Sequence, residues 1–302
     1  MSPAATVLIV TKDRREELLR AVEGAVAQEG EPEVLVVDDA SGDGSADAVQ
    51  QAFPNVRVLR SERSEGAIAQ RNRGVGEASA PLVVSVDDDV VFPSRATVAQ
   101  TVRDFDHPRV GAVAVPFVDV RHSRDVQQRA LSEDGVWVAS GFIGCACAVR
   151  RDAFQAVGGF RRALGQYWEE PDLALRMLDR GWITRLGRAD PIEHHESSAR
   201  VQERKLMLGR RNGILTACFT VPARSLPGHL AWLTANTLVT AATEGPPGPL
   251  IRGTAVGYRD AVRLRAERHP VDRTVFRLRQ RLWRQGPERL DAVEAELPAR
   301  AS

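Results

Sequence analysis

Short apolar segments alternate with helical ones over the first hundred residues, and this alternation constrains the fold more than any other feature of the chain. Four apolar segments rich in Val read as buried strands, at residues 6–11, 33–39, 55–60 and 81–89. Residues with helical spacing separate them, over about 18–26, 45–53 (with Ser45 as the expected N-cap) and around 70–73. This rhythm predicts an α/β fold with a mostly parallel central sheet, doubly wound and flanked by helices.

Acidic residues stand where these strands end. Asp38 and Asp39 close the second strand, and Asp87–Asp89 close the fourth. Ligands of doubly wound sheets bind beyond the carboxyl ends of the strands, so these acids and Thr11 should meet in one cleft. Crowded carboxylates raise one another's pKa, and a hard divalent cation would relieve that repulsion. A lone acidic triplet also fits a solvated turn, and the rest of the chain decides between the two.

The glycine-rich phosphate-binding motifs are missing. No G-x-x-x-x-G-K-[ST] occurs in the chain, and no G-x-G-x-x-G follows the first strand. A cleft of this kind that binds phosphates would therefore do so through a metal ion and arginine side chains.

Four blocks carry a resemblance to a known family. They are VLIVTKDR, LVVDDASGDGSAD, AQRNRG and VVSVDDDVVFP, which begin at residues 7, 35, 69 and 83. In order and spacing they resemble the nucleotide-sugar-binding half of glycosyltransferase family 2, which has the GT-A fold. The resemblance implies an inverting, metal-dependent enzyme that moves a sugar from a UDP- or dTDP-sugar to an acceptor hydroxyl, the acceptor being a small molecule or a glycan.

The resemblance also implies roles for donor-site residues. Thr11 and either Asp38 or Asp39 would contact the base, and Asp88 would hold the ribose. Arg71 would lie near the diphosphate, although taken alone it reads as a surface arginine of its helix. The sequence does not decide which acid of the 38–39 pair faces the base.

A metal site is the next implication. Asp89 would coordinate Mn²⁺ or Mg²⁺, with Asp87 beside it. Relatives commonly complete this site with a histidine shortly after the catalytic helix, and the block IEHHESSAR offers His194 and His195. His194 is slightly favoured, and a nitrogen ligand suits Mn²⁺ somewhat better than Mg²⁺.

The segment YWEEPDLALRMLDRGW supplies the candidate general base. Glu169, Glu170 and Asp172 cluster at a predicted helix start, where the helix dipole favours negative charge and a carboxylate can accept a proton from a hydroxyl. A simple charged N-cap is the alternative. The family pattern, an acidic pair, one spacer and then Asp-Leu, puts the base at Glu170, with Glu169 as a competitor and Asp172 as an anchor of the helix start. The family more often has Asp at the base position.

Three further expectations concern the second half of the chain. Residues 110–120 read as one strand. Trp168 either stacks on an acceptor or is an interior residue. Arg210-Arg211-Asn212 resembles a family feature and would help to hold the diphosphate.

The resemblance weakens after residue 224. We therefore expect a catalytic domain over 1–224, with a donor half at 1–105 and an acceptor half at 106–224, and a helical extension over 225–302. The extension is rich in arginine between residues 252 and 284. Packing on the catalytic domain is its plainest role, and the alternatives are contact with an anionic membrane surface, binding of a partner and closure over the active site.

Composition narrows the classes of function. The formal net charge is +1, so no overall field favours nucleic acid or a membrane. The three cysteines have no spacing typical of a zinc or redox site and read as free thiols in a reducing cytoplasm. The sequence predicts no signal peptide and no membrane span, and therefore a cytoplasmic protein.

Two rival functions remain at this stage. A sugar nucleotidyltransferase usually has a glycine- and lysine-rich loop after the first strand, where this chain has only Lys12. A catalytically degenerate nucleotide-sugar-binding scaffold is the other rival, and the intact acids at both candidate sites argue against it.

Overall fold

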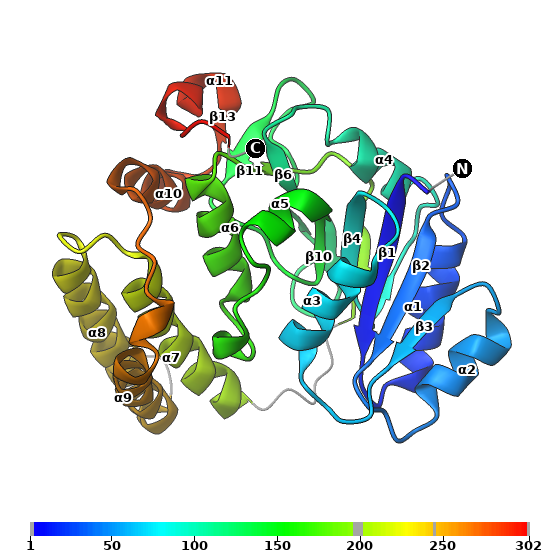
Figure 1. Cartoon of the computed structure of the whole chain (residues 1–302), viewed down its shortest axis with the longest axis horizontal. Coiled ribbons are helices and arrows are strands. Elements are labelled where there is room, and N and C mark those ends of the chain that lie inside the picture. Colours follow the sequence, from blue (N-terminus) through cyan, green and yellow to red (C-terminus); the bar gives the residue numbers. More distant parts are fainter. Residues whose placement is uncertain (1–2, 196–201, 244–245, 301–302) are drawn as a thin grey trace.

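The computed structural model describes residues 3–195, 202–243 and 246–300, and their core is a large twisted sheet (Figure 1). Within these residues, nine strands pair in the order β13-β9-β11-β6-β10-β4-β1-β2-β3. The strands are β1 (Ala5–Thr11), β2 (Glu33–Asp38), β3 (Arg57–Arg60), β4 (Leu82–Asp87), β6 (Val110–Ala114), β9 (Trp137–Ala139), β10 (Ala146–Arg150), β11 (Ile183–Leu186) and β13 (Glu288–Arg289).

Most of the sheet runs in one direction. Parallel pairing joins β3, β2, β1 and β4, and it also joins β6 to β11. Only β10 and β9 run against the others, since each pairs antiparallel with both of its neighbours. The predicted α/β fold with a mostly parallel central sheet is therefore confirmed.

Helices cover both faces of the sheet. They are α1 (Arg15–Val26), α2 (Ser45–Ala52), α3 (Ala67–Glu77), α4 (Thr97–Arg103), α5 (Arg151–Ala156) and α6 (Glu169–Asp179). Side chains of β1 alternate between the faces, so that Val7 and Ile9 pack with α1 while Leu8 packs with α3. Gly74 permits the close approach of α3, because a Cβ there would lie 2.3 Å from Leu8 Cδ1.

A second, smaller sheet stands beside the end of β4. It has the order β5-β12-β7-β8 and consists of β5 (Val90–Val91), β12 (Ile192–His194), β7 (Phe117–Asp119) and β8 (Val126–Gln127). The prediction of one strand over 110–120 is wrong, because the chain leaves the central sheet after Ala114 and enters the small sheet at Phe117. Pro116 lies between them and has no N–H to donate to a continuous ladder.

The start of α2 also differs from the prediction. Gly44, with a φ of 80°, precedes the helix, and Ser45 is already its first residue. The Ser45 hydroxyl donates to Asp43, whose carboxylate also accepts the Arg15 N–H at 3.0 Å. Asp43 therefore links the loops that precede α1 and α2.

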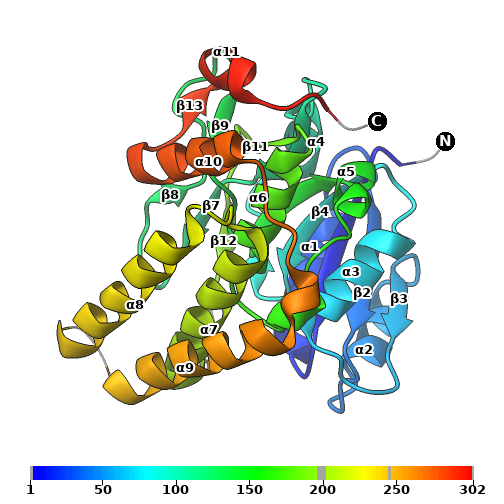
Figure 2. The same ribbon diagram turned by 60° about the vertical axis from the view of Figure 1, so that its left-hand side comes forward.

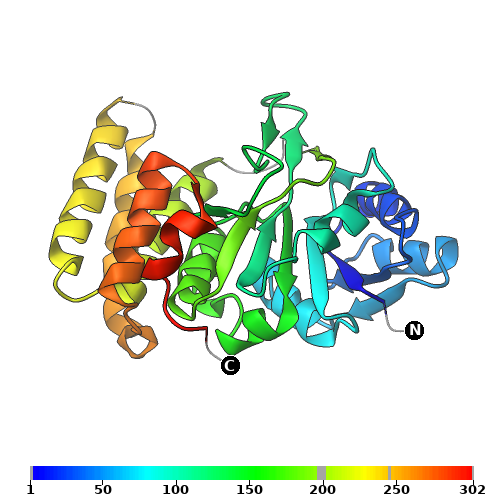
Figure 3. The ribbon, with the colours of Figure 1, turned by 90° about the horizontal axis from the view of Figure 1, so that it is seen from above.

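The C-terminal third is helical and lies at one end of the molecule, away from the N-terminal half (Figures 1 and 3). It contains α7 (Gln202–Thr220), α8 (Leu226–Thr243), α9 (Pro247–Arg263), α10 (Arg273–Gln285) and α11 (Leu290–Val293). Helices α7 and α9 pack closely, since a Cβ at Gly253 would lie 2.3 Å from the Met207 carbonyl oxygen. Buried residues of α10, including Phe276 and Leu278, join the core of the sheet, and β13 extends the sheet at its edge.

Two composition-based expectations bear on this structure. The three cysteines are free thiols, as predicted. Among the described residues, no helix combines the length and the apolar character that a bilayer crossing requires.

Candidate active site

A cleft of about 780 Å³ lies where the central strands end. Its walls come from the carboxyl ends of β1 and β4, the start of α3, the loop before β10, the start of α6, and β12. Eight of the residues predicted from sequence line it: Thr11, Asp39, Arg71, Asp87, Asp88, Glu169, Glu170 and His194. Asp89 is buried next to this wall, whereas Asp38, Asp172 and His195 are not among the lining residues.

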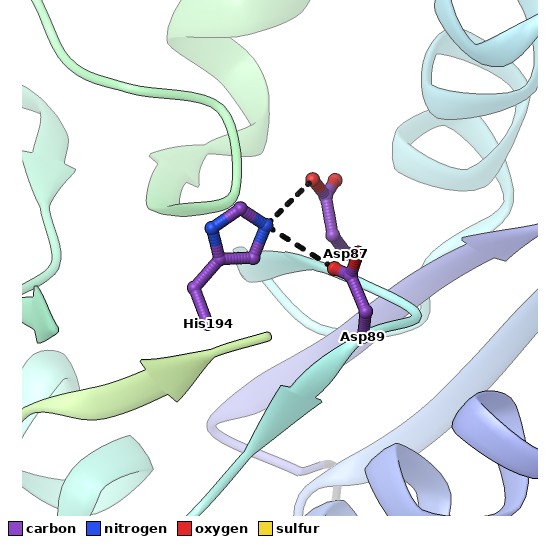
Figure 4. A group of neighbouring side chains, drawn as sticks. All are labelled: Asp87, Asp89 and His194. Atoms are coloured by element: carbon purple, nitrogen blue, oxygen red, sulfur yellow. Dashed lines mark ion pairs between the residues drawn. The ribbon is translucent and has the colours of Figure 1, made fainter. Parts of the chain in front are cut away.

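Asp87, Asp89 and His194 form a compact group that could hold a metal ion (Figure 4). One ligand atom of each residue lies within 4.8 Å of the others. His194 Nε2 is 3.2 Å from Asp89 Oδ1 and 3.8 Å from Asp87 Oδ2. Antiparallel pairing of β12 with β5 creates this contact, because it sets His194 opposite Val90, the residue after the acidic triplet.

The neighbouring histidine lies outside this group. The ring of His195 is 42% exposed, and its Nε2 atom is 3.3 Å from Glu193. Its backbone N–H donates to the Asp89 carbonyl at 2.9 Å, so it contributes to the turn through its main chain. The geometry thus favours His194 over His195 as the histidine ligand.

Asp88 is not part of this candidate metal group. Its carboxylate accepts the Thr11 hydroxyl at 2.8 Å and pairs with Arg14 at 2.6 Å. Burial raises the pKa of Asp88 to about 6 despite the opposing effect of Arg14. In Asp89, burial also acts to raise the pKa, but His194 and Arg14 outweigh it and the pKa is lowered.

Arg14 is a site residue that the sequence analysis did not single out. Its guanidinium contacts Asp88 and, at 3.0 Å, Asp89. Its position three residues after the end of the first strand was the available signal, since that end faces the cleft.

Arg71 is buried, which excludes the alternative of a surface arginine. Its guanidinium pairs with Asp87 and, at 3.4 Å, with Glu169. Burial acts to lower the pKa of Arg71, but the charges of Asp87, Glu169 and Glu170 raise it further, so it stays a cation. Arg71 thereby links the metal-binding side of the cleft to the start of α6.

Glu170 lies against the backbone of Gly144. A Cβ at residue 144 would be 2.2 Å from Glu170 Oε1, so a larger residue there would displace the carboxylate from its present position. Burial, with the charge of Glu169, raises the pKa of Glu170 to about 8. In its ionised form, a carboxylate of this pKa is a stronger base than an ordinary glutamate and can accept a proton from a hydroxyl.

The loop before α6 is held in an unusual conformation. Tyr167 and Trp168 both have left-handed φ angles, of 69° and 70°, which non-glycine residues rarely adopt. The buried Asn212 amide donates to the carbonyl oxygens of Leu164, Gln166 and Tyr167 and so fixes the loop.

The expectation that Arg210, Arg211 and Asn212 hold the diphosphate is wrong. Arg211 pairs with Asp260 at 2.8 Å, and Arg210 donates to the Thr240 hydroxyl. None of the three lines the cleft. Lys205 and Gly209, which lie five residues and one residue before Arg210 on α7, line it instead.

Asp38 and Asp39 are both engaged in local hydrogen bonds. Asp38 accepts from Ser41 and does not line the cleft. Asp39 lines the cleft, and its two oxygens accept four bonds, from Ser64, Gln70 and the N–H groups of 65 and 66. A carboxylate has about four lone-pair sites, so a base that binds Asp39 would displace one of these partners.

Asp172 is buried and does not line the cleft. Its fully buried carboxylate pairs with Arg161 at 2.9 Å and with Arg176 at 2.6 Å. Arg176 also donates to the Val157 and Gly159 carbonyls, so this group joins α6 to the loop after α5.

We expect Asp172→Asn to lower the free energy of unfolding by about 3 kcal/mol, because it leaves two largely buried guanidinium groups without their shared counter-charge. Chemical denaturation measures this change. Asp47→Asn is the control, since it removes the carboxylate of an exposed pair with Arg60 and should cost no more than about 0.5 kcal/mol. Equal effects of the two substitutions would contradict the structural role of Asp172.

The charge balance of the cleft suits a cation. Five acidic residues lie in or beside it: Asp87, Asp88, Asp89, Glu169 and Glu170. Among the residues that the structure describes, Arg14 and Arg71 pair with these acids, and Lys12 and Lys205 also line the cleft. Oxygen ligands with one imidazole nitrogen match the preferences of Mn²⁺ and Mg²⁺. The residues therefore fit a divalent metal ion.

Comparison with known proteins places this site in a family. Residues 6–161, just over half of the chain, match the family model for Glycosyl transferase family 2. The succinoglycan biosynthesis protein ExoO of Rhizobium meliloti is 37% identical over 97 residues, which are 31% of this chain and 28% of that protein. The chain thus spans less than a third of that relative.

Two matches that cover more of the chain are also to glycosyltransferases. An N-acetylglucosaminyl-diphospho-decaprenol L-rhamnosyltransferase of Mycobacterium tuberculosis is 25% identical over 217 residues, covering 57% of this chain and 69% of that protein. The mannosyltransferase PcManGT of Pyrobaculum calidifontis, solved with GDP-Man and Mn²⁺, has the same fold with a TM-score of 0.59 at 20% identity, covering 88% of this chain and 87% of that one. The chain belongs to glycosyl transferase family 2.

Proposed function

We propose that this protein is an inverting, metal-dependent glycosyltransferase that moves a sugar from a nucleoside diphosphate, UDP or dTDP, to an acceptor hydroxyl. One observation carries the proposal: a group of metal-ligand type, Asp87, Asp89 and His194, shares a cleft with a half-buried glutamate of raised pKa, Glu170. Family membership and a structural relative with GDP-Man and Mn²⁺ support it.

The donor side of the reaction would use the residues around β4. Asp89, Asp87 and His194 would hold Mn²⁺ or Mg²⁺, and a metal ion bound there offsets charge on the departing nucleoside diphosphate. Arg71, already fixed by two carboxylates, would add a positive charge near the same group. Thr11 and Asp88, which share a hydrogen bond and line the cleft, would contact the nucleoside.

The acceptor side would use Glu170. Its carboxylate would take the proton from the acceptor hydroxyl while the oxygen attacks the anomeric carbon on the face opposite the leaving diphosphate. A single displacement of this kind inverts the configuration. Glu169 is less suited to the role of base, because its carboxylate already pairs with Arg71.

Metal-dependent binding of the nucleotide tests the proposal most directly. At a ligand concentration of about 100 times Kd, UDP or dTDP with Mn²⁺ should raise Tm by about 5 °C, because ligand binding stabilises the folded state by about 2.7 kcal/mol. Thermal unfolding with and without EDTA measures this effect. A Tm unchanged by nucleotides in the presence of Mn²⁺ would contradict the assignment of the cleft.

The products of turnover distinguish a glycosyltransferase from a sugar nucleotidyltransferase. A glycosyltransferase releases nucleoside diphosphate from the donor, and slow hydrolysis of the donor already yields that product. Release of pyrophosphate would instead identify a nucleotidyltransferase.

A further inference from the structure

A second cavity, of about 650 Å³, is lined by residues of α6, α7, α8 and α10. Figure 2 shows how these four helices are arranged. The walls of the cavity are largely apolar and aromatic and include Leu175, Trp232, Leu233, Phe276 and Trp283. It is separate from the sites proposed above for the nucleotide and the metal. Most of its residues come from helices beyond residue 161, where the match to the family model ends, while Gln128 and residues 140–143 lie within the matched range.

The cavity opens onto the active-site cleft beside Glu170. Phe142, Ile143, Trp168 and Pro171 line both spaces. Trp168 and Pro171 flank the glutamate pair at the start of α6, so a molecule that fills the cavity can extend one end past Trp168 to the proposed base. This is the direction from which an acceptor would approach the donor sugar.

The charged residues of the cavity are all basic. Arg210, Arg279 and Arg284 line it, and none of the described residues in its wall is Asp or Glu. The Arg279 Nε atom is out of contact with solvent and has no hydrogen-bond partner among the described residues. Burial, with the charges of Arg279 and Arg284, lowers the pKa of His229. An anionic group on a ligand would supply the missing counter-charge.

The outer part of the cavity is apolar. Trp232 and Trp283 meet edge to face with ring centroids 6.1 Å apart, and they are 44% and 54% exposed. Helix α8 has no Asp, Glu, Lys or Arg between residues 226 and 243. Val239, 59% exposed, lies on the same face as Trp232 at helical spacing, so the apolar surface continues beyond the cavity.

We propose that this cavity binds the acceptor, and that the acceptor is an amphiphile in which an apolar chain carries a phosphate or diphosphate group. The chain would pack on Trp232 and Trp283, and the phosphate would pair with Arg279. The inference rests on the proposed function. In the transfer, the acceptor oxygen bonds to the anomeric carbon, the bond from that carbon to the diphosphate oxygen breaks, and the hydroxyl proton passes to Glu170.

Dodecyl phosphate, used below its micelle-forming concentration, is a suitable probe, since it combines both chemical features without a sugar. Titration followed by tryptophan fluorescence and calorimetry should show saturable binding. Dodecyl maltoside, which has the same chain without the charge, and inorganic phosphate, which has the charge without the chain, should each bind at least tenfold more weakly.

Substitutions of arginine residues test whether dodecyl phosphate binds in this cavity. Arg279→Gln should weaken dodecyl phosphate binding at least tenfold, because it removes a charge-assisted contact. Arg277→Gln, which changes an exposed arginine of the same helix, should leave the affinity unchanged. If Arg279→Gln does not fold, Arg284→Gln serves instead, since Arg284 is exposed and lines the same cavity; we expect about a threefold loss.

Several outcomes would overturn the proposal. They are equal affinity for dodecyl maltoside, equal affinity for phenyl phosphate, which lacks the chain, or an affinity that both arginine substitutions in the cavity leave intact. Nucleotide binding with Mn²⁺, measured on the same preparation, tests the proposed donor site independently of the proposed acceptor site. Nucleotide binding without dodecyl phosphate binding would remove only the acceptor assignment, and the reverse would remove only the donor assignment.

Discussion

Glu170→Gln is expected to lower kcat for sugar transfer by about 10²- to 10⁴-fold, the usual contribution of a general base. Glutamine keeps the shape of the side chain next to Gly144 but cannot accept the proton. The Mn²⁺-dependent affinity for nucleotide should change little, because the donor would be held by residues of β1, β4 and α3. Steady-state kinetics and calorimetry on the same variant measure the two effects.

The pH dependence of the wild-type enzyme gives an independent check. Because the pKa of Glu170 is raised to about 8, its carboxyl group is mostly protonated, and inactive as a base, below that pH. The value of kcat/KM should therefore rise about tenfold per pH unit up to about pH 8 and then level off. Glu169→Gln is the matched control, because it makes the same substitution at the neighbouring glutamate. Loss of transfer in that variant, with full activity in Glu170→Gln, would move the base to Glu169.

Asp89→Asn should lower kcat/KM by about 10³-fold and abolish the Tm increase that nucleotide causes with Mn²⁺. A metal ion contributes several kcal/mol to stabilising the charge of a transition state, and each 1.4 kcal/mol corresponds to a factor of ten. The substitution removes the carboxylate that lies closest to His194 while keeping a side chain of the same size. Electron paramagnetic resonance of bound Mn²⁺ measures the loss of the ion directly.

Two adjacent histidines provide the matched pair for this experiment. His194→Ala should weaken Mn²⁺ binding, whereas His195→Ala should not, because the ring of His195 faces Glu193. Equal Mn²⁺ affinities in the two variants would contradict the assignment of the metal group.

Local sequence signals predicted the framework of the donor site. The strands and the acids that close them are encoded within single segments, because a buried parallel strand is a nearly continuous apolar run. For that reason β1, β2 and β4 appear within one or two residues of their predicted ends. Asp87 and Asp88 consequently line the predicted cleft.

Contacts between distant segments could not be predicted in this way. His194 reaches the acids only because β12 pairs with β5, and these strands are separated by about a hundred residues. Likewise, Arg71 reads as an exposed helix residue until α6 brings Glu169 next to it. The split of residues 110–120 between two sheets had one local signal, Pro116, and the sequence analysis did not use it.

The C-terminal helices were the least predictable part. Their apolar spacing indicated helices but not the cavity, whose walls come from α6, α7, α8 and α10 together. The pair of Arg211 with Asp260 could likewise not be predicted from the sequence, because Asp260 lies on α9, 49 residues further along the chain. A resemblance that weakens after residue 224 could not supply these pairings.

The three hydrogen bonds of Asn212 couple the loop that precedes Glu170 to the wall of the second cavity. The asparagine holds the loop that precedes Glu170, and the next residue on α7, Gly213, forms part of the second cavity's wall. A change in α7 that accommodates a bulkier partner would therefore also shift the catalytic loop. Substitutions on α7 that change the substrate preference should lower kcat unless a further substitution restores the conformation of the loop.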